Sequence, residues 1–159
     1  MSLQALEDSV VAILQVVFDD YETVTVAPLA QMKAEFEHVI DDPQVWVVLE
    51  SIKGGEEEST QALRQGCTYR FGFVIKARLL RGDLGVYNLI DLVNAAALGK
   101  RPQDGSGWLK LISWTTVSEE NGTWRAIGVM ECPGLPLFEQ YDLNADDGAP
   151  LEVLTHTEE

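Results

Sequence analysis

CTYRFGFVIKARLL, residues 67–80, is the clearest strand in the sequence. Arg70, Lys76 and Arg78 alternate along it with apolar side chains. Successive side chains of a strand point to opposite faces, so the alternation predicts one face on a core and one facing water or a partner. At about 14 residues the stretch exceeds a usual strand, which predicts a long protruding hairpin or a bulge near Gly72. The apolar positions are Tyr69, Phe71, Phe73, Ile75, Ala77 and Leu79.

Four elements are predicted before this strand. Residues 2–18 carry apolar residues at helical spacing and predict an amphipathic helix with Ser2 as its N-cap. Residues 22–27 and 45–52 are rich in β-branched residues and predict two strands, and residues 31–40 predict a short helix. Residues 54–59, reading GGEEES, cannot bury a face and predict a solvated loop or hairpin tip.

One helix and a hairpin are predicted after it. Residues 83–99 show an apolar helical stripe that ends at Gly99, a residue suited to the left-handed conformation that stops helices. Residues 107–117 and 123–131 predict two strands, and the Asn-Gly pair within residues 119–122 is a strong hairpin signal.

The predicted fold is a single α+β domain over residues 1–132. It contains an antiparallel or mixed sheet of four to five strands with two to three helices packed on it. Residues 133–159 contain three prolines and no Lys or Arg, and they predict an extended acidic C-terminal arm. We expect this arm either to clasp a neighbouring molecule or to form a frayed extension.

The charge distribution excludes several classes of partner. A net charge of −15 argues against sequence-independent nucleic-acid binding, which needs Lys and Arg on phosphates. The sequence has no apolar run of about 20 residues and no basic leader, so we expect a protein made and kept in a cytosol without a membrane partner. Residues 64–110 have a charge of +5 between segments of −11 and −9. This pattern fits either an acidic surface that aids solubility or a self-complementary subunit that docks head-to-tail in a ring.

The sequence contains no recognisable catalytic, cofactor-binding or metal-binding set. His38 and His156 are the only histidines, and neither has a nucleophile or metal ligands at an established spacing. Cys67 and Cys132 could pair, but a reducing compartment favours two buried thiols. We therefore expect a protein that is not an enzyme.

Four tryptophans remain to be assigned. Core packing is the simpler interpretation, and an interface is the alternative, because tryptophan is enriched at interface centres. Two of them share the predicted strand at residues 107–117 at an even spacing, which would place them on one face. The four residues are Trp46, Trp108, Trp114 and Trp124.

The segments RGDLGVYNLIDLVNAAALGKRP (81–102) and GWLKLISWTTVSEENGTWRAIGVMEC (107–132), after the basic strand, resemble a known family. They are similar to the small tail proteins of Mu-like phages and prophages, and through them to tail terminator (tail completion) proteins of the lambda gpU type. The resemblance covers about residues 66–131. It implies a structural subunit of a long-tailed bacteriophage, located in the virion tail. Such subunits form a six-fold ring that stops growth of the tail tube and joins the head, so the implied partners are other copies, tail tube proteins and head–tail connector proteins.

The resemblance gives the charge pattern a specific interpretation. We expect Arg70, Lys76, Arg78 and Arg81 to form the basic side of the contact between copies. DNA passes through such a ring, and an acidic lumen would repel it, so either the C-terminal arm or the acidic loop could line the lumen. The loop residues are Glu56, Glu57 and Glu58. The alternative function is a monomeric acidic adaptor or chaperone-like protein that binds a basic assembly partner.

Overall fold

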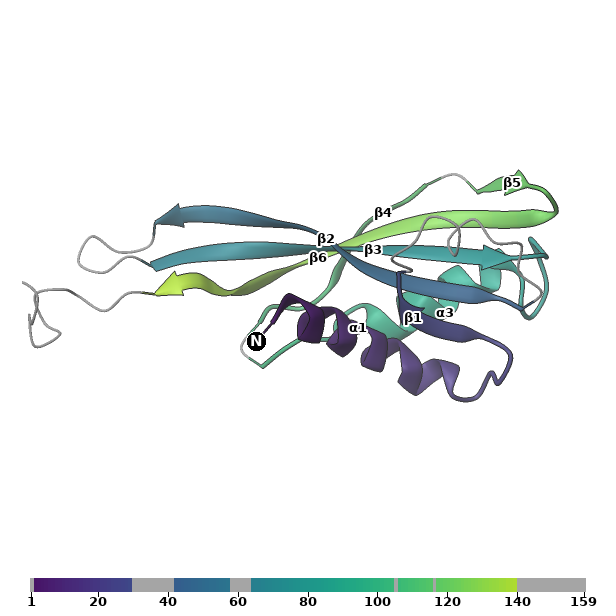
Figure 1. Ribbon diagram of the computed structural model, residues 1–159, viewed down its shortest axis with the longest axis horizontal. Helices are drawn as coiled ribbons and strands as arrows, with labels where there is room; N and C mark the ends of the chain where they lie inside the picture. Colours follow the sequence, from purple (N-terminus) through teal and green to yellow (C-terminus); the bar gives the residue numbers. More distant parts are fainter. Residues whose placement is uncertain (1, 30–41, 58–63, 105, 116, 140–159) are drawn as a thin grey trace, which may run out of the picture.

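The computed structural model describes residues 2–29, 42–57, 64–104, 106–115 and 117–139. These residues form a mixed six-stranded sheet with two helices on one of its faces (Figure 1). The predicted α+β class is therefore confirmed, while the short helix predicted at 31–40 lies outside the described residues. In chain order the elements are α1 (Leu3–Phe18), β1 (Thr25–Pro28), β2 (Gln44–Glu57), β3 (Arg64–Ala77), α3 (Val86–Ala97), β4 (Lys110–Trp114), β5 (Ser118–Glu120) and β6 (Thr123–Glu139).

β3 lies at the centre of the sheet. The strand order is β1-β2-β3-β6-β4, and β5 pairs with β6 beyond the end of β4. β1 is parallel to β2, and every other described strand pair is antiparallel. The predicted long hairpin is confirmed as β2 and β3, and a register shift lies on β2 between Leu49 and Ser51.

The two helices cover the inner face of the sheet. Ser2 caps α1 as predicted, because its hydroxyl accepts a hydrogen bond from the backbone N–H of Ala5 at 3.1 Å. Every fourth residue of α1 from Leu6 to Phe18 is buried, which gives the helix a narrow apolar stripe. α3 also packs its stripe inward, and Gly99 has the predicted positive φ, +76°, just beyond its end.

The sheet has one strand more than predicted because β5 forms at Ser118–Glu120, beyond the expected strand at 107–117, of which β4 occupies only Lys110–Trp114. The backbone N–H of Thr115 donates to the Ile127 carbonyl at 2.8 Å, and its hydroxyl also donates to that carbonyl at 3.1 Å. The Thr115 hydroxyl accepts from the Ile127 N–H at 3.3 Å. The side chain thus takes the place of a continuing β ladder at this point. The predicted hairpin at Asn121-Gly122 is confirmed, with positive φ at both residues.

Of the two alternatives predicted for residues 54–59, the loop is wrong for residues 54–57, which belong to β2 and form the outer end of the β2–β3 hairpin. Residues 58 and 59 lie outside the described residues. The strand continues because β3 is long enough to pair with it as far as Glu57↔Gln65. The Gln65 side-chain amide also donates to the carbonyl of Gly55 at 2.8 Å. On the other side of β3, β6 runs past Pro133 to Glu139, so a strand crosses the predicted start of the arm.

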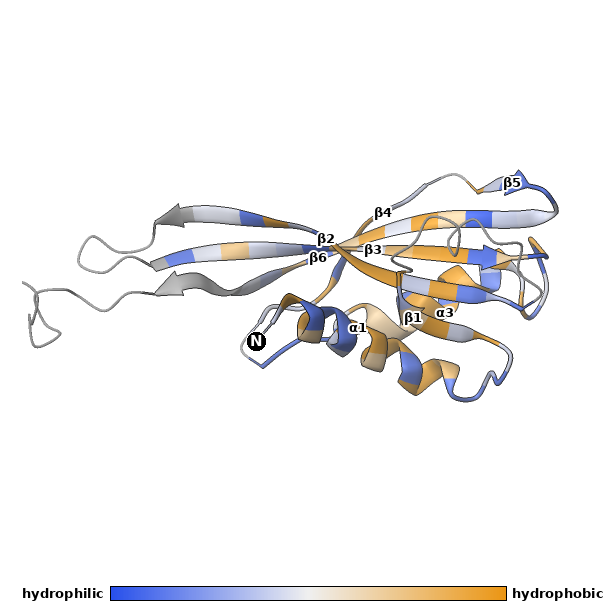
Figure 2. Ribbon diagram, viewed as in Figure 1, coloured by the Kyte–Doolittle hydropathy of each residue, from blue (hydrophilic) through white to orange (hydrophobic). Residues whose placement is uncertain are grey.

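One half of the sheet extends beyond the helices (Figure 1). We call this half the blade. It consists of residues 51–57 of β2, 64–70 of β3 and 131–139 of β6. These three segments pair with one another, and Glu131 also pairs with the end of β4. The strands are apolar where they lie over the helices and mostly polar or weakly hydrophobic in the coloured part of the blade (Figure 2). Most of the hydrophobic core therefore lies in the other half of the molecule, and Cys67, Tyr69 and Cys132 extend it to the base of the blade.

The packing of α1 leads to a stability prediction. Leu14 is 0% exposed in the core, whereas Val16 on the same helix is 75% exposed. Leu14→Ala should lower the free energy of unfolding by about 2–5 kcal/mol, because it removes buried methyl groups and leaves a cavity. Val16→Ala should change it by no more than about 0.5 kcal/mol. Urea unfolding followed by circular dichroism would measure both, and equal effects would contradict the assigned orientation of α1.

Candidate functional site

The sheet face opposite the helices, which we call the helix-free face, carries a charged row across the base of the blade. The strand register places Ser51 of β2, Arg70 of β3, Glu131 of β6 and Lys110 of β4 side by side. Arg70 Nη2 lies 3.2 Å from Glu131 Oε2, with 43% and 32% of the two side chains exposed. Exposed ion pairs of this kind contribute little stability, so the pair is better understood as a feature of the surface.

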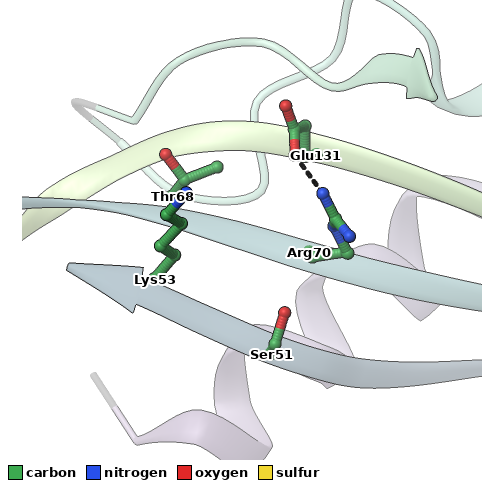
Figure 3. Close-up of a pocket in the computed structure, with 5 residues that line it drawn as sticks. All are labelled: Ser51, Lys53, Thr68, Arg70 and Glu131. Atoms are coloured by element: carbon green, nitrogen blue, oxygen red, sulfur yellow. Dashed lines mark hydrogen bonds and ion pairs between the residues drawn. The ribbon is translucent and has the colours of Figure 1, made fainter. Parts of the chain in front are cut away.

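A hollow of about 360 Å³ opens beside this row (Figure 3). Arg70 reaches across it to Glu131, and Lys53 and Thr68 come from the next register pair toward the blade tip. Ser51 completes the lining. Two hydroxyl groups and two cations converge here against one carboxylate, which suits an acidic group of a partner.

An apolar strip lies next to the charged row on the same face. It consists of Val48, Gly72 and Val129, which are neighbours across three strands, and of Ile127 on β6. Ile127 is 40% exposed. A Cβ at Gly72 would lie 3.1 Å from Val48 Cγ1 and 3.5 Å from Glu50 Oε2. Glycine therefore leaves a recess at the centre of the strip, and the Glu50 carboxylate borders it. Ile112, at the register shift of β4, adds a further exposed aliphatic side chain.

Lys76 does not occupy the exposed position that strand alternation predicted. It is 2% exposed, and its Nζ lies 5.1 Å from the centroid of the Trp46 ring, which is itself buried. Gln44 and Arg125 are its neighbours on β2 and β6. A desolvated ammonium over an aromatic face is a favourable arrangement.

The remaining predicted basic residues are spread over two regions. Arg70 belongs to the charged row, whereas Arg78 and Arg81 follow β3 at the end of the body away from the blade. Arg78 lines a different hollow with Asp42 and Leu79, and the Arg81 guanidinium lies 5.7 Å from the centroid of the Tyr87 ring. The four predicted residues therefore do not form one patch.

The predicted acidic loop is only partly described. Glu56 and Glu57 lie in the last residues of β2, near the blade tip, and Glu58 lies outside the described residues. Their position at a lumen stays a prediction. Sequence reasoning missed Lys53, Lys110 and Glu131, because their proximity depends on the pairing of four strands.

The tryptophans divide between the core and the surface. Trp46 is buried, and Trp114 is half-buried with its indole N–H donating to the Asn94 side chain at 3.0 Å. Trp124 packs against the edge of the core. Trp108 is 52% exposed and lies before β4, with the Arg101 guanidinium 5.1 Å from the centroid of its ring. The predicted shared strand face of Trp108 and Trp114 is therefore wrong.

Both cysteines are buried free thiols, as predicted. They lie at the base of the blade on the inner face, where Cys132 is opposite Tyr69 and Cys67 is opposite Gly134. Burial raises the pKa of the Cys132 thiol to about 11, with smaller effects from Cys67 and Glu131. Burial also raises the pKa of Tyr69.

No metal site or membrane span is found in the part of the chain that the structure describes. No three His, Cys, Asp or Glu side chains among those residues are grouped to hold a metal ion. Neither described helix combines the length and the apolar character that a bilayer span requires.

The buried thiol leads to a pH prediction. The pKa of Cys132 rises from its ordinary value of 9.0 to about 11 on folding, so the unfolded chain loses this proton first. The protonated Cys132 thiol therefore makes its full contribution to the free energy of unfolding below about pH 9, and this contribution decreases as the pH rises toward 11. Urea unfolding between pH 7 and 10.5 should show this decrease, and Cys132→Ala should make it shallower. Identical slopes for the two proteins would contradict the assignment.

The position of Lys76 leads to a second prediction for this face. Lys76→Glu should lower the free energy of unfolding by about 3 kcal/mol or more, because it buries a carboxylate in a site built around a cation. Lys53→Glu makes the same change in charge at an exposed position, and should change it by no more than about 0.5 kcal/mol. Urea unfolding would measure both, and a harmless Lys76→Glu would contradict the burial of this side chain.

Comparisons with known proteins match most of the chain. The family model described as Gp37 protein matches residues 10–158. Among solved structures, a chain of "Virion of native gene transfer agent (GTA) particle" is 12% identical, with a TM-score of 0.41. The alignment covers 79% of this chain and 85% of that chain. No curated protein matches the sequence.

Proposed function

We propose a structural role in the virion of a long-tailed bacteriophage for this chain, which belongs to the Gp37 protein family. In this proposal the chain is a tail terminator or tail completion subunit and not an enzyme. The observation that carries the proposal is the blade, which extends past the hydrophobic core of the same molecule. The sequence resemblance to tail terminator proteins points to the same role.

The blade supports an assembly role because an isolated chain gains little from it. Strands in globular proteins usually have about five or six residues, whereas β2, β3 and β6 have 14, 14 and 17. Beyond Lys110↔Glu131, β2 and β6 have no outer strand neighbour among the described residues. The Gly107 N–H donates to the Pro133 carbonyl at 2.6 Å, which satisfies one group of that edge. Neighbouring subunits would cover the remaining surface.

A ring is the closed arrangement that the chain suits best. Head-to-tail contacts join two different surfaces of identical copies, and they form a ring when the rotation between copies closes. The blade is one such surface, and the body with the helix-free face is another. The alternation of acidic and basic segments along the chain fits contacts between unlike surfaces. In the proposed ring, acidic residues near the blade tip would lie toward the lumen.

The mass of the purified protein would test this function. Six copies of the 17.6 kDa chain have a mass of about 106 kDa, and we expect this species in light scattering after size exclusion at high protein concentration. Electron microscopy of the same fraction should show rings with a central hole. A monomer at every concentration that also fails to bind tail tubes would reject the proposal and favour the monomeric adaptor.

A shortened blade provides the matched variant. Residues 55–66 would be replaced by Asn-Gly, which joins the paired residues Gly54 and Cys67 by a two-residue turn. This variant should keep the near-ultraviolet circular dichroism of the wild type, because the core residues of the body are unchanged. It should remain monomeric where the wild type forms rings. Rings with the same number of copies as the wild type would show that the blade is not an assembly element.

A further inference from the structure

We propose that the helix-free face binds the acidic C-terminal segment, residues 140–159, of a neighbouring copy. That the segment comes from a neighbouring copy rests on the proposed function, whereas the chemistry of the binding surface does not. The surface consists of the charged row with its hollow and the apolar strip beside it. An occupant that fits both must be acidic and must also carry aliphatic side chains.

The charges of the face select an acidic occupant. Lys53, Arg70 and Lys110 lie around Glu131. The Glu50 carboxylate lies beside Gly72 on the same face, so three cations face two carboxylates in a chain whose net charge is −15. Arg70 is partly neutralised by Glu131, and Ser51 and Thr68 add hydroxyl donors at the hollow. A carboxylate entering the hollow would gain charge-assisted hydrogen bonds without displacing a buried group.

The apolar strip selects an occupant with aliphatic side chains. Val48 and Val129 flank the recess at Gly72, and Ile127 remains 40% exposed next to them. No helix lies on this face of the sheet (Figure 1) among the described residues. An extended segment with apolar residues between its acids could cover this strip and place its carboxylates on the charged row.

The C-terminal segment has this composition. It contains no Lys or Arg, and its acids alternate with short apolar stretches. The acids are Asp142, Asp146, Asp147, Glu152, Glu158 and Glu159, and the aliphatic residues with large side chains are Leu143, Leu151, Val153 and Leu154.

The direction of β6 favours the face of a neighbouring copy over the chain's own face. β6 ends at Glu139, which pairs with Arg64 at the outer end of the blade. The strand therefore ends at the tip of the blade, away from the chain's own apolar strip, and its last described residues run outward. Twenty extended residues reach at most about 70 Å, which is sufficient to cross to an adjacent subunit.

A binding measurement tests the surface independently of any ring. The probe is a fluorescent peptide of residues 140–159, and its anisotropy is measured against the full-length chain carrying Asp142→Asn, Asp146→Asn, Asp147→Asn and Glu152→Gln. These changes weaken competition from the chain's own arm. We expect saturable binding that Arg70→Glu in the same chain weakens about fivefold or more. Lys100→Glu is the matched control, since Lys100 is exposed in the loop after α3, and it should leave the affinity unchanged.

Three outcomes of this measurement would overturn the proposal. The first is that the peptide does not bind. The second is that Arg70→Glu and Lys100→Glu weaken peptide binding equally. The third is that a peptide carrying the same four substitutions binds as tightly as the unchanged peptide. The second outcome would indicate a general charge attraction, and the third would show that the acids are not recognised.

The masses of the two full-length chains then identify the source of the segment. Light scattering at equal concentration measures both masses. If a neighbouring copy holds the segment, the wild type should have the larger mass and the arm-substituted chain the smaller one. Two monomers, with peptide binding only to the arm-substituted chain, would show that the arm covers its own face and would overturn the contact between copies. Equal larger masses would also overturn it. A wild type that binds the peptide but forms open chains would reject the ring and keep the binding surface.

Discussion

The pairing of β3 with β2 on one side and β6 on the other determines the rest of the structure. This pairing extends over the whole of β3, from Arg64 to Ala77. Because side chains alternate along a strand, the register decides at once which residues meet in the core and which meet on the opposite face. Phe71, Phe73 and Ile75 face the helices, and Arg70, Gly72 and Val74 lie between them on the other side. A shift of one residue would exchange these two sets.

The same strands serve two purposes along their length. In the body, α1 and α3 cover the inner face, and burial of apolar side chains stabilises the fold. In the blade the backbone ladder continues without a helical layer, so the strands gain their hydrogen bonds but little hydrophobic stabilisation. The loop before β4 supports only the base of the blade, where the Gly107 N–H donates to Pro133. The body therefore contains most of the hydrophobic core, and the base of the blade contributes Cys67, Tyr69 and Cys132 to it.

Local sequence patterns predicted the elements well, because helix and strand periodicity are properties of neighbouring residues. The alternation in residues 67–80 identified the inner face of β3, and Asn121-Gly122 identified the hairpin. The errors arose where a distant residue decides the outcome. Lys76 is buried with its ammonium group over the Trp46 ring of β2, a contact that local alternation cannot predict. Residues 54–57 form a strand because β3 is long enough to pair with them.

The candidate surface was less predictable than the fold for the same reason. Arg70 was identified from its place in a basic strand, but Lys53, Lys110 and Glu131 come from three other strands. Their separation in sequence conceals a row that forms only when four strands align. Alternation alone also assigned Lys76 to this surface, because a period of two separates faces but cannot show how deeply a face is buried.

Net charge constrains how copies of this chain can meet. Each copy carries −15, so two copies repel one another at long range, and any contact must bring local opposite charges together. Repulsion between distant exposed charges is screened beyond about 8–10 Å at moderate salt, whereas pairs in contact are screened much less. The charged row and its hollow bring Lys53, Arg70 and Lys110 together on one face, and such a group could supply a local contact within an acidic molecule. The acidic excess and the basic row are therefore compatible in the proposed contact: the first would keep copies apart in dilute solution, and the second would set where they join.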